Sequence, residues 1–562
     1  MKTRLADLWR WCLSRLPEAL FVLFVLALVP MVVLGVRRLL VVIGTAVASP
    51  STLFTEAAAN LWLVAAVLVC LVGFAGLVVV MWRNWGLIWA VARKMILEAF
   101  HRKVVIVLLV FFVVLMPSLP FVLKTEGSLK SQVQIVLLYS LALGMVLLSL
   151  LAIFCATASI CSEVERRHVH ITDTKPLFRW QFLVGKWLGI VVMCTAVLYG
   201  MAGGTYVLIR LLVMDPDYDS MTAQEVNEAR DERQQVLNEV LIARRSVTTP
   251  LPDVSAEVEA EIERLREIGK MSPYVHSFRK TTTEQMLSRK MSVPPGASHR
   301  WDFKGLEPQA SGWVHVRFKG YWQGGRGIHG FWWPVRVEMA KAEGSAGEAQ
   351  ETMRRLMQIG APPGGWTNNV SHELKLPARF INADGTLTLL YENAEPGMPI
   401  NHSVVFDIES PVEVLQKEQG FLPNYYRSLL IILFHVGLLA ALGLMAGALF
   451  SFPVATLLVA CLFIGGLISP WFAQFVEPNI YARLTTWGEQ LDRIWRAAAS
   501  FLLALMPNFS SFSPLGDLVG GRSVPWGRVA SAGSVLLLIK GGAAMLIGMY
   551  FYARRELARV IV

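Results

Sequence analysis

One short stretch of the sequence, from Cys161 to Leu188, gathers acidic, basic and imidazole side chains between two long apolar runs. Its ionisable residues are Glu163, Glu165, Arg166, Arg167, His168, His170, Asp173, Lys175, Arg179 and Lys186. Because almost no Gly or Pro interrupts it, the pattern predicts a charged helix held closely between two membrane spans. Such a helix is well suited to being displaced by a protein on the same side of the membrane.

Motifs for nucleotide binding and for common catalytic sites do not occur in the sequence. The chain has no Gly-rich phosphate-binding loop of the GxxxxGK[ST] form, and no zinc-protease, Ser-hydrolase or kinase motif. We therefore expect that the chain is not an enzyme, and that it holds no cofactor or metal of its own.

Two ionisable residues, His435 and Lys540, fall inside predicted membrane spans. Charged and titratable groups are expensive in a bilayer, so each is a candidate for an intramembrane pathway. Lys540 has two alternatives, because its long side chain can extend to the interface or face the interior of the helical bundle.

Eight apolar runs are long enough to be membrane spans, since a bilayer core of about 30 Å needs roughly 20 residues per helix. They lie at about 19–36, 61–82, 104–123, 135–160, 183–213, 428–450, 452–473 and 529–553. The chain is 54% hydrophobic and 17% charged, which also indicates a polytopic α-helical membrane protein.

The distribution of charge orients these spans. Residues 215–418 hold 23 Lys/Arg against 29 Asp/Glu, whereas the rest of the chain holds 29 against 13. Basic residues mark cytoplasmic loops, and with eight spans the basic segments all fall on one side. We therefore expect both termini and the charged stretch in the cytoplasm, and residues 214–424 outside it. The basic excess is then no sign of nucleic-acid binding.

The segment 214–424, expected to be extracytoplasmic, contains two kinds of sequence pattern. Residues 222–270 are polar, with an apolar stripe from Val254 to Ile268 at helical spacing, and predict a helical hairpin. Residues 298–415 alternate with a period of two between turn residues, which predicts a β-sandwich or jelly-roll-like domain. Its many Trp residues favour a packed core, with a stacking platform for a sugar or lipid headgroup as the alternative.

Three further segments complete the organisation. Residues 1–84 form a two-span extension. Residues 85–103 predict an amphipathic helix, either in the cytoplasmic interface or packed beneath neighbouring spans. Residues 474–528 contain an apolar run of only about ten residues, which is too short to span and indicates a re-entrant or interfacial segment.

The charged stretch and its surroundings resemble the permease subunits of type-2 ABC transporters. The matching residues in the stretch are Glu163, Glu165, Lys175, Pro176, Arg179, Phe182, Gly185 and Lys186. Near the other end they are Met506, Pro507, Asn508 and Phe509, and the segment FYARREL from Phe551 to Leu557. The resemblance covers about 85–213 and 425–562, the two halves of a six-span core.

The resemblance implies a working arrangement. Residues 85–103 would be an elbow helix, and 163–175 a coupling helix that docks on a separate ATPase subunit. The implied ATPase-coupling residues are Glu163, Glu165, Arg166, Arg167, Lys175 and Arg179. Two permeases, as a homodimer or heterodimer, would work with two ATPases that bind ATP and Mg²⁺. We expect an exporter in a bacterial inner membrane.

Two features depart from the common pattern of that family, namely the extra spans in 1–84 and the large insert at 214–424. An outer domain of this size suits an extracytoplasmic partner. It also leaves a second hypothesis open, in which the chain is a membrane-anchored binding or scaffold protein that transmits signal or force.

Overall fold

The computed structural model describes twelve segments and several isolated positions. The segments are residues 84–101, 128–165, 178–214, 222–268, 275–308, 312–322, 328–335, 359–360, 365–394, 402–408, 410–469 and 509–554. The isolated positions are 107, 110–111, 471, 494–495, 497–500 and 506–507. The predicted extension 1–84, except its last residue, and most of the run 104–123 lie outside the described residues.

Five helical stretches in the described part are long and apolar enough to cross a membrane. They are Leu129–Glu163, Arg179–Leu212, Phe421–Leu449, Phe452–Ser469 and Trp526–Arg554. These correspond to the last five of the eight predicted runs, as expected for a polytopic helical membrane protein. The first three runs are not tested by the described residues.

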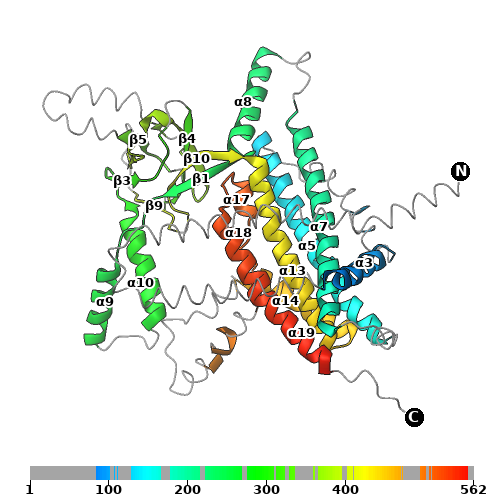
Figure 1. The fold of residues 1–562 in the computed structure, drawn as a ribbon. Coiled ribbons are helices and arrows are strands. Elements are labelled where there is room, and N and C mark those ends of the chain that lie inside the picture. The colour runs from blue at the N-terminus through cyan, green and yellow to red at the C-terminus, as the bar shows by residue number, and fades with distance from the viewer. Residues whose placement is uncertain are drawn as a thin grey trace, which may run out of the picture.

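A central helix, α13 (Phe421–Leu449), organises the membrane part. It packs against α5 (Leu129–Glu165), α7 (Arg179–Leu212), α14 (Phe452–Leu467) and the C-terminal helices. The C-terminal span is made of α18 (Trp526–Ala532), a π-helical turn η4 (Gly533–Gly541) and α19 (Gly542–Arg554). The predicted elbow helix corresponds to α3 (Trp85–His101), which packs across α7 (Figure 1).

Small residues let α13 and α5 approach closely. A Cβ atom added to Gly443 would lie 2.6 Å from the Cβ of Ala156, and one added to Gly447 would lie 3.2 Å from the Cβ of Ile160. Close approach through small residues is a common way to associate helices in membranes. The pair α5 and α13 therefore forms a rigid centre of the bundle.

We expect Gly443→Val to lower the thermal unfolding midpoint of the purified protein by several degrees, because overpacking a core costs about 1–3 kcal/mol. The matched control is Gly200→Val on α7, where an added Cβ meets no atom within 4 Å. Thermal unfolding in detergent measures both variants, and an equal decrease in the two would contradict this account of the contact.

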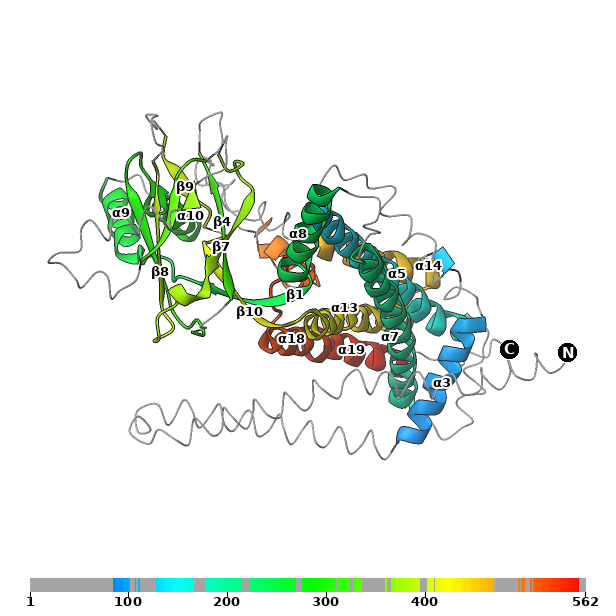
Figure 2. The same ribbon diagram turned by 90° about the horizontal axis from the view of Figure 1, so that it is seen from above.

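The β domain is built from two facing sheets beside the helical bundle (Figures 1 and 2). One sheet has the order β1-β10-β4-β9-β2, with β7 also paired to β4, and the other has the order β3-β8-β5-β6. The first contains β1 (Ile242–Thr248), β2 (Ser292–Val293), β4 (Trp313–Tyr321), β7 (Ser371–Pro377), β9 (Val404–Phe406) and β10 (Glu413–Gly420). The second contains β3 (Ser298–Phe303), β5 (Phe331–Val335), β6 (Ile359–Gly360) and β8 (Leu387–Glu392).

Aromatic side chains fill the space between the sheets. Trp301, Trp332 and Phe406 are buried there, with ring centroids 4.9 to 5.7 Å apart. Trp366 is also buried in this core. Trp301, Trp332 and Trp366 therefore serve as core and do not form a surface platform, whereas Trp313 stays 61% exposed.

The helical part of the insert differs from the predicted hairpin. Helix α8 (Ala223–Glu239) ends early and packs on α5, while α9 (Ser255–Glu267) packs on α10 (Val275–Lys290). Between them the chain forms strand β1, which pairs with β10 along its length. The apolar stripe is present, since Val254, Val258 and Ile262 are buried, but its partner is α10.

The β domain joins the bundle without a connecting loop at one point. Strand β10 ends at Gly420, and α13 begins at the next residue, Phe421. A second connection runs from α8, whose Thr222 and Glu225 form a capping box, into β1. The central helix of the bundle is therefore continuous with an interior strand of the six-stranded sheet.

Candidate functional site

A buried ion pair joins the start of the charged stretch to the helices around it. The ammonium of Lys186 lies 3.1 Å from the Glu163 carboxylate and over the ring of Phe182, and it donates to the Ser159 carbonyl. Lys94 on α3 lies 3.6 Å from the same carboxylate. Glu163 therefore links the end of α5 to α7 and α3, and only 12% of its side chain is exposed.

Two glycines next to this pair bring α3 onto α7. A Cβ on Gly185 would lie 2.7 Å from the Cβ of Val91, and one on Gly189 would lie 2.8 Å from the carbonyl oxygen of Ala92. The Gly-Lys pair at 185–186 thus has two roles at successive residues. The glycine allows close helix packing, and the lysine reaches the acidic end of α5.

Arg179 takes a different position from Glu163. Its guanidinium donates to the carbonyl oxygens of Tyr552, at 3.2 Å, and Ala553, at 2.6 Å. The ring of Phe182 stacks on that of Tyr552 at 5.9 Å. The start of α7 is therefore attached to the end of α19, because cationic side chains satisfy the free carbonyls at a helix C-terminus.

The other predicted coupling residues are not placed by the structure. Arg166, Arg167 and Lys175 lie outside the described residues, as does the side chain of Glu165. Their part in contacting an ATPase stays a prediction. Of the predicted set, Glu163 and Arg179 hold the helix ends on either side of this segment.

The two predicted intramembrane residues both contact the segment that precedes the last span. His435 is fully buried, with its ring 5.0 Å from the ring of Phe509. Lys540, in the π-helical turn, donates to the Met506 carbonyl at 2.7 Å. Phe509 also packs against Phe463 of α14, at 5.6 Å. This segment therefore enters the helical bundle, and both residues hold it there.

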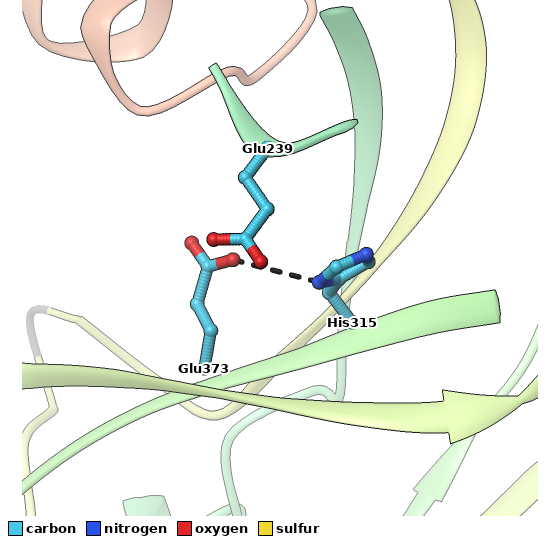
Figure 3. A group of neighbouring side chains, drawn as sticks. All are labelled: Glu239, His315 and Glu373. Carbon is cyan, nitrogen blue, oxygen red and sulfur yellow. Dashed lines mark ion pairs between the residues drawn. The ribbon is translucent and has the colours of Figure 1, made fainter. Parts of the chain in front are cut away.

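A second polar cluster lies where the β domain meets the bundle. Figure 3 shows the carboxylates of Glu239 and Glu373 and the imidazole of His315 pointing toward one another. His315 Nδ1 lies 3.6 Å from Glu373 Oε2. Arg244, which is 1% exposed, binds the same carboxylate at 2.9 and 3.3 Å, and Arg317 binds it at 2.5 Å.

The cluster extends to the loop before α18. The Gly520 carbonyl accepts hydrogen bonds from Arg244, at 3.0 Å, and Arg317, at 2.6 Å. Glu413 of β10 binds Arg317 at 3.3 Å and Arg522 at 2.7 Å. We call Arg244, Arg317, Glu373, Glu413 and Arg522 the junction cluster, because they tie the six-stranded sheet to the membrane part.

Burial and neighbouring charges set the protonation of these groups. Burial, together with the positive charge of Arg244, lowers the pKa of His315 to about 4, so its imidazole is neutral at pH 7. Burial alone would raise the pKa of Glu373, but the hydrogen bond and charge of Arg244 and the charge of Arg317 lower it to about 2. Glu373 is therefore ionised.

The geometry of Glu239, His315 and Glu373 also resembles a metal-ligand set, since one ligand atom of each lies within 4.8 Å of the others. The charges argue against a cation. Glu239 already binds Lys130 at 2.5 Å and Lys375 at 3.3 Å. With Arg244 and Arg317 on Glu373, four cationic side chains face two carboxylates, so a divalent ion would meet a net positive environment.

The sequence did not predict the contact of Lys186 with Glu163, nor the contacts around Glu373. Lys186 stood out only as part of a motif, although the pattern Gly185-xxx-Gly189 is a signal for close helix packing. Glu239, His315 and Glu373 come from segments far apart in the chain, so no local spacing could connect them.

Residues 89–226 match the family model described as ABC-2 family transporter protein. The matched segment contains most of α3, all of α5 and α7, and the charged stretch between them. Searches of curated proteins and of solved structures found no match.

Proposed function

We propose that the chain works as the membrane permease subunit of an ATP-driven exporter, because residues 89–226 match the ABC-2 family transporter model. The ATP and Mg²⁺ would be bound by a separate ATPase subunit, since this sequence has no phosphate-binding loop. Residues 163–175 would form the helix that docks on that subunit from the cytoplasm.

The observation that carries the proposal is the packing around Glu163. The charged stretch begins at the end of α5 and leads into α7, and the pair Glu163–Lys186 fixes these two helices to each other. Because Lys94 of α3 also reaches Glu163, the elbow helix belongs to the same unit. A push on the charged stretch would therefore move three packed helices together.

Rigid transmission of this kind suits ATP-driven transport. Closure of two ATPase subunits would displace the docking helices, and the spans continuous with them would tilt. The outward sides of α14 and α19 carry exposed apolar residues, including Leu457, Ile464 and Leu546, which suit contact with lipid or a second permease. We propose two permeases and two ATPases in the working complex.

Co-purification with the ATPase tests the proposal. The full chain is expressed with a P-loop ATPase subunit, and residues 166–175 are replaced by a Gly/Ser linker of equal length. We expect loss of the complex and a decrease of about tenfold or more in permease-stimulated ATP hydrolysis, because the docking surface is removed.

The matched control is Arg279→Ala on α10, which removes an exposed ion pair with Glu259 far from the cytoplasmic end. That variant should bind and stimulate the ATPase as the wild type does. Unchanged complex formation after the linker replacement would contradict the proposal. It would favour the alternative of a membrane-anchored binding or scaffold protein.

A further inference from the structure

A cleft of about 970 Å³ lies between α8 and the six-stranded sheet, close to the junction cluster. Its size is at the upper end of the range for small-molecule sites. One wall is the polar face of α8, and the other is formed by residues of β1, β4, β7 and β10. No step of the proposed transport mechanism uses this cleft.

One residue of the cleft lining, His315, is buried. His315 lines the cleft and is 6% exposed, and its Nδ1 has no hydrogen-bond partner among the described residues. The 3.6 Å separation from Glu373 Oε2 is too long for a hydrogen bond. This nitrogen faces the carboxylates of Glu373 and Glu239 (Figure 3) and is closed to solvent, so contacts with a ligand fall to the other lining residues.

The walls carry balanced charge. Three carboxylates on α8 face three cations, and the lining residues are Glu228, Asp231 and Glu232 with Arg244, Lys375 and Lys417. Their formal charges cancel, so the cleft selects neither an anion nor a cation over long range. Gln234, Gln235 and Asn238 add amide donors and acceptors.

An exposed indole completes the lining. Trp313 begins β4 and is 61% exposed, whereas Trp301, Trp332 and Trp366 are buried in the core. The face of an indole carries partial negative charge and attracts the C–H groups of a sugar ring, while carboxylates and amides bind its hydroxyls. This combination matches a polyhydroxylated ligand better than an apolar one.

We propose that the cleft between α8 and the six-stranded sheet binds a neutral oligosaccharide that stacks on Trp313 and presents its hydroxyls to the carboxylates and amides of α8. The side chains of Asp231, Asn238 and Lys375 would bind further hydroxyls along the walls. This inference goes beyond transport and does not depend on it, because binding is measured on the permease alone.

Binding to the full-length protein in detergent tests the proposal. The probes are fluorescein-labelled cellohexaose, maltohexaose and chitohexaose, followed by fluorescence anisotropy. We expect saturable binding of at least one. Trp313→Ala should weaken it about tenfold, and Trp313→Phe should stay within about threefold of the wild type, because a ring is kept.

The matched control is Tyr321→Ala, which removes another exposed ring at the opposite end of β4 and should leave binding unchanged. Absence of binding for all three sugars would overturn the proposal, as would equal binding by Trp313→Ala and the wild type. Stronger binding of an uncharged labelled octapeptide would overturn it too, by assigning the cleft to peptides.

Discussion

Replacing Lys186 by methionine is expected to lower both the stability of the protein and its stimulation of the proposed ATPase partner. Lys186 is 3% exposed and is the close partner of the Glu163 carboxylate. Removal of one partner of a buried ion pair costs about 3–5 kcal/mol, because the remaining charge stays buried. We expect a fall of several degrees in the thermal unfolding midpoint and at least a tenfold loss of stimulated ATP hydrolysis.

Two further variants separate charge from packing. In the double variant Lys186→Met with Glu163→Gln no buried charge is left unpaired, so much of the stability should return. Lys94→Met removes a cation whose side chain is 70% exposed, and should change stability by less than about 1 kcal/mol. If Lys186→Met has the unfolding midpoint and the ATPase stimulation of the wild type, the pair of Glu163 and Lys186 does not hold the helices together as described.

Substitution of Arg244 by alanine is expected to have the largest effect in the β domain. Arg244 binds both oxygens of Glu373 and the Gly520 carbonyl, and its backbone pairs with Gly521 and Ser523. Its loss leaves Glu373 with Arg317 alone and should destabilise the β domain by about 3–5 kcal/mol. Limited proteolysis and thermal unfolding measure this effect.

Lowering the pH is expected to weaken the contacts around Glu373. The folded pKa of Glu373, about 2, is below its ordinary value of 4.5, so its stabilisation is present above pH 4.5 and is lost as the pH falls toward 2. His315, with a folded pKa of about 4 against 6.5, loses stabilisation as the pH falls from 6.5 through 4. Both groups therefore weaken the junction on acidification.

In Arg244→Ala the pKa of Glu373 should rise, so stability should depend less steeply on pH between 4.5 and 2. Arg279→Ala is again the control, because its pair with Glu259 is more than half exposed and should contribute less than about 1 kcal/mol. A pH profile for Arg244→Ala that parallels the wild type would contradict the assignment of this effect to Glu373.

Much of the membrane architecture could be predicted because it follows from local sequence. Apolar length gave the five described spans, and helical periodicity gave α3 and the stripe of α9. The predicted hairpin of α8 with α9 does not form, because tertiary packing and not local sequence decides which helix covers an apolar stripe. The strand at 242–248 is set by pairing with β10, which local periodicity does not show.

The candidate sites were predicted less completely than the fold. The charge-dense stretch was evident, and Glu163 and Arg179 were singled out, but as residues facing a partner. The structure places both against neighbouring helices. Contacts such as Lys186 with Glu163 and Arg244 with Glu373 join residues distant in sequence, so spacing alone cannot predict them.

Because β10 passes into α13 without interruption, a tilt of the central helix is transmitted directly to the β domain. A helix of 29 residues is about 43 Å long, so a tilt of about 10° moves its end by roughly 7 Å. With no flexible linker at Gly420 to absorb that motion, the β sheet must follow it. A spectroscopic label on the sheet would then record, outside the membrane, each movement that begins at the opposite end of the bundle.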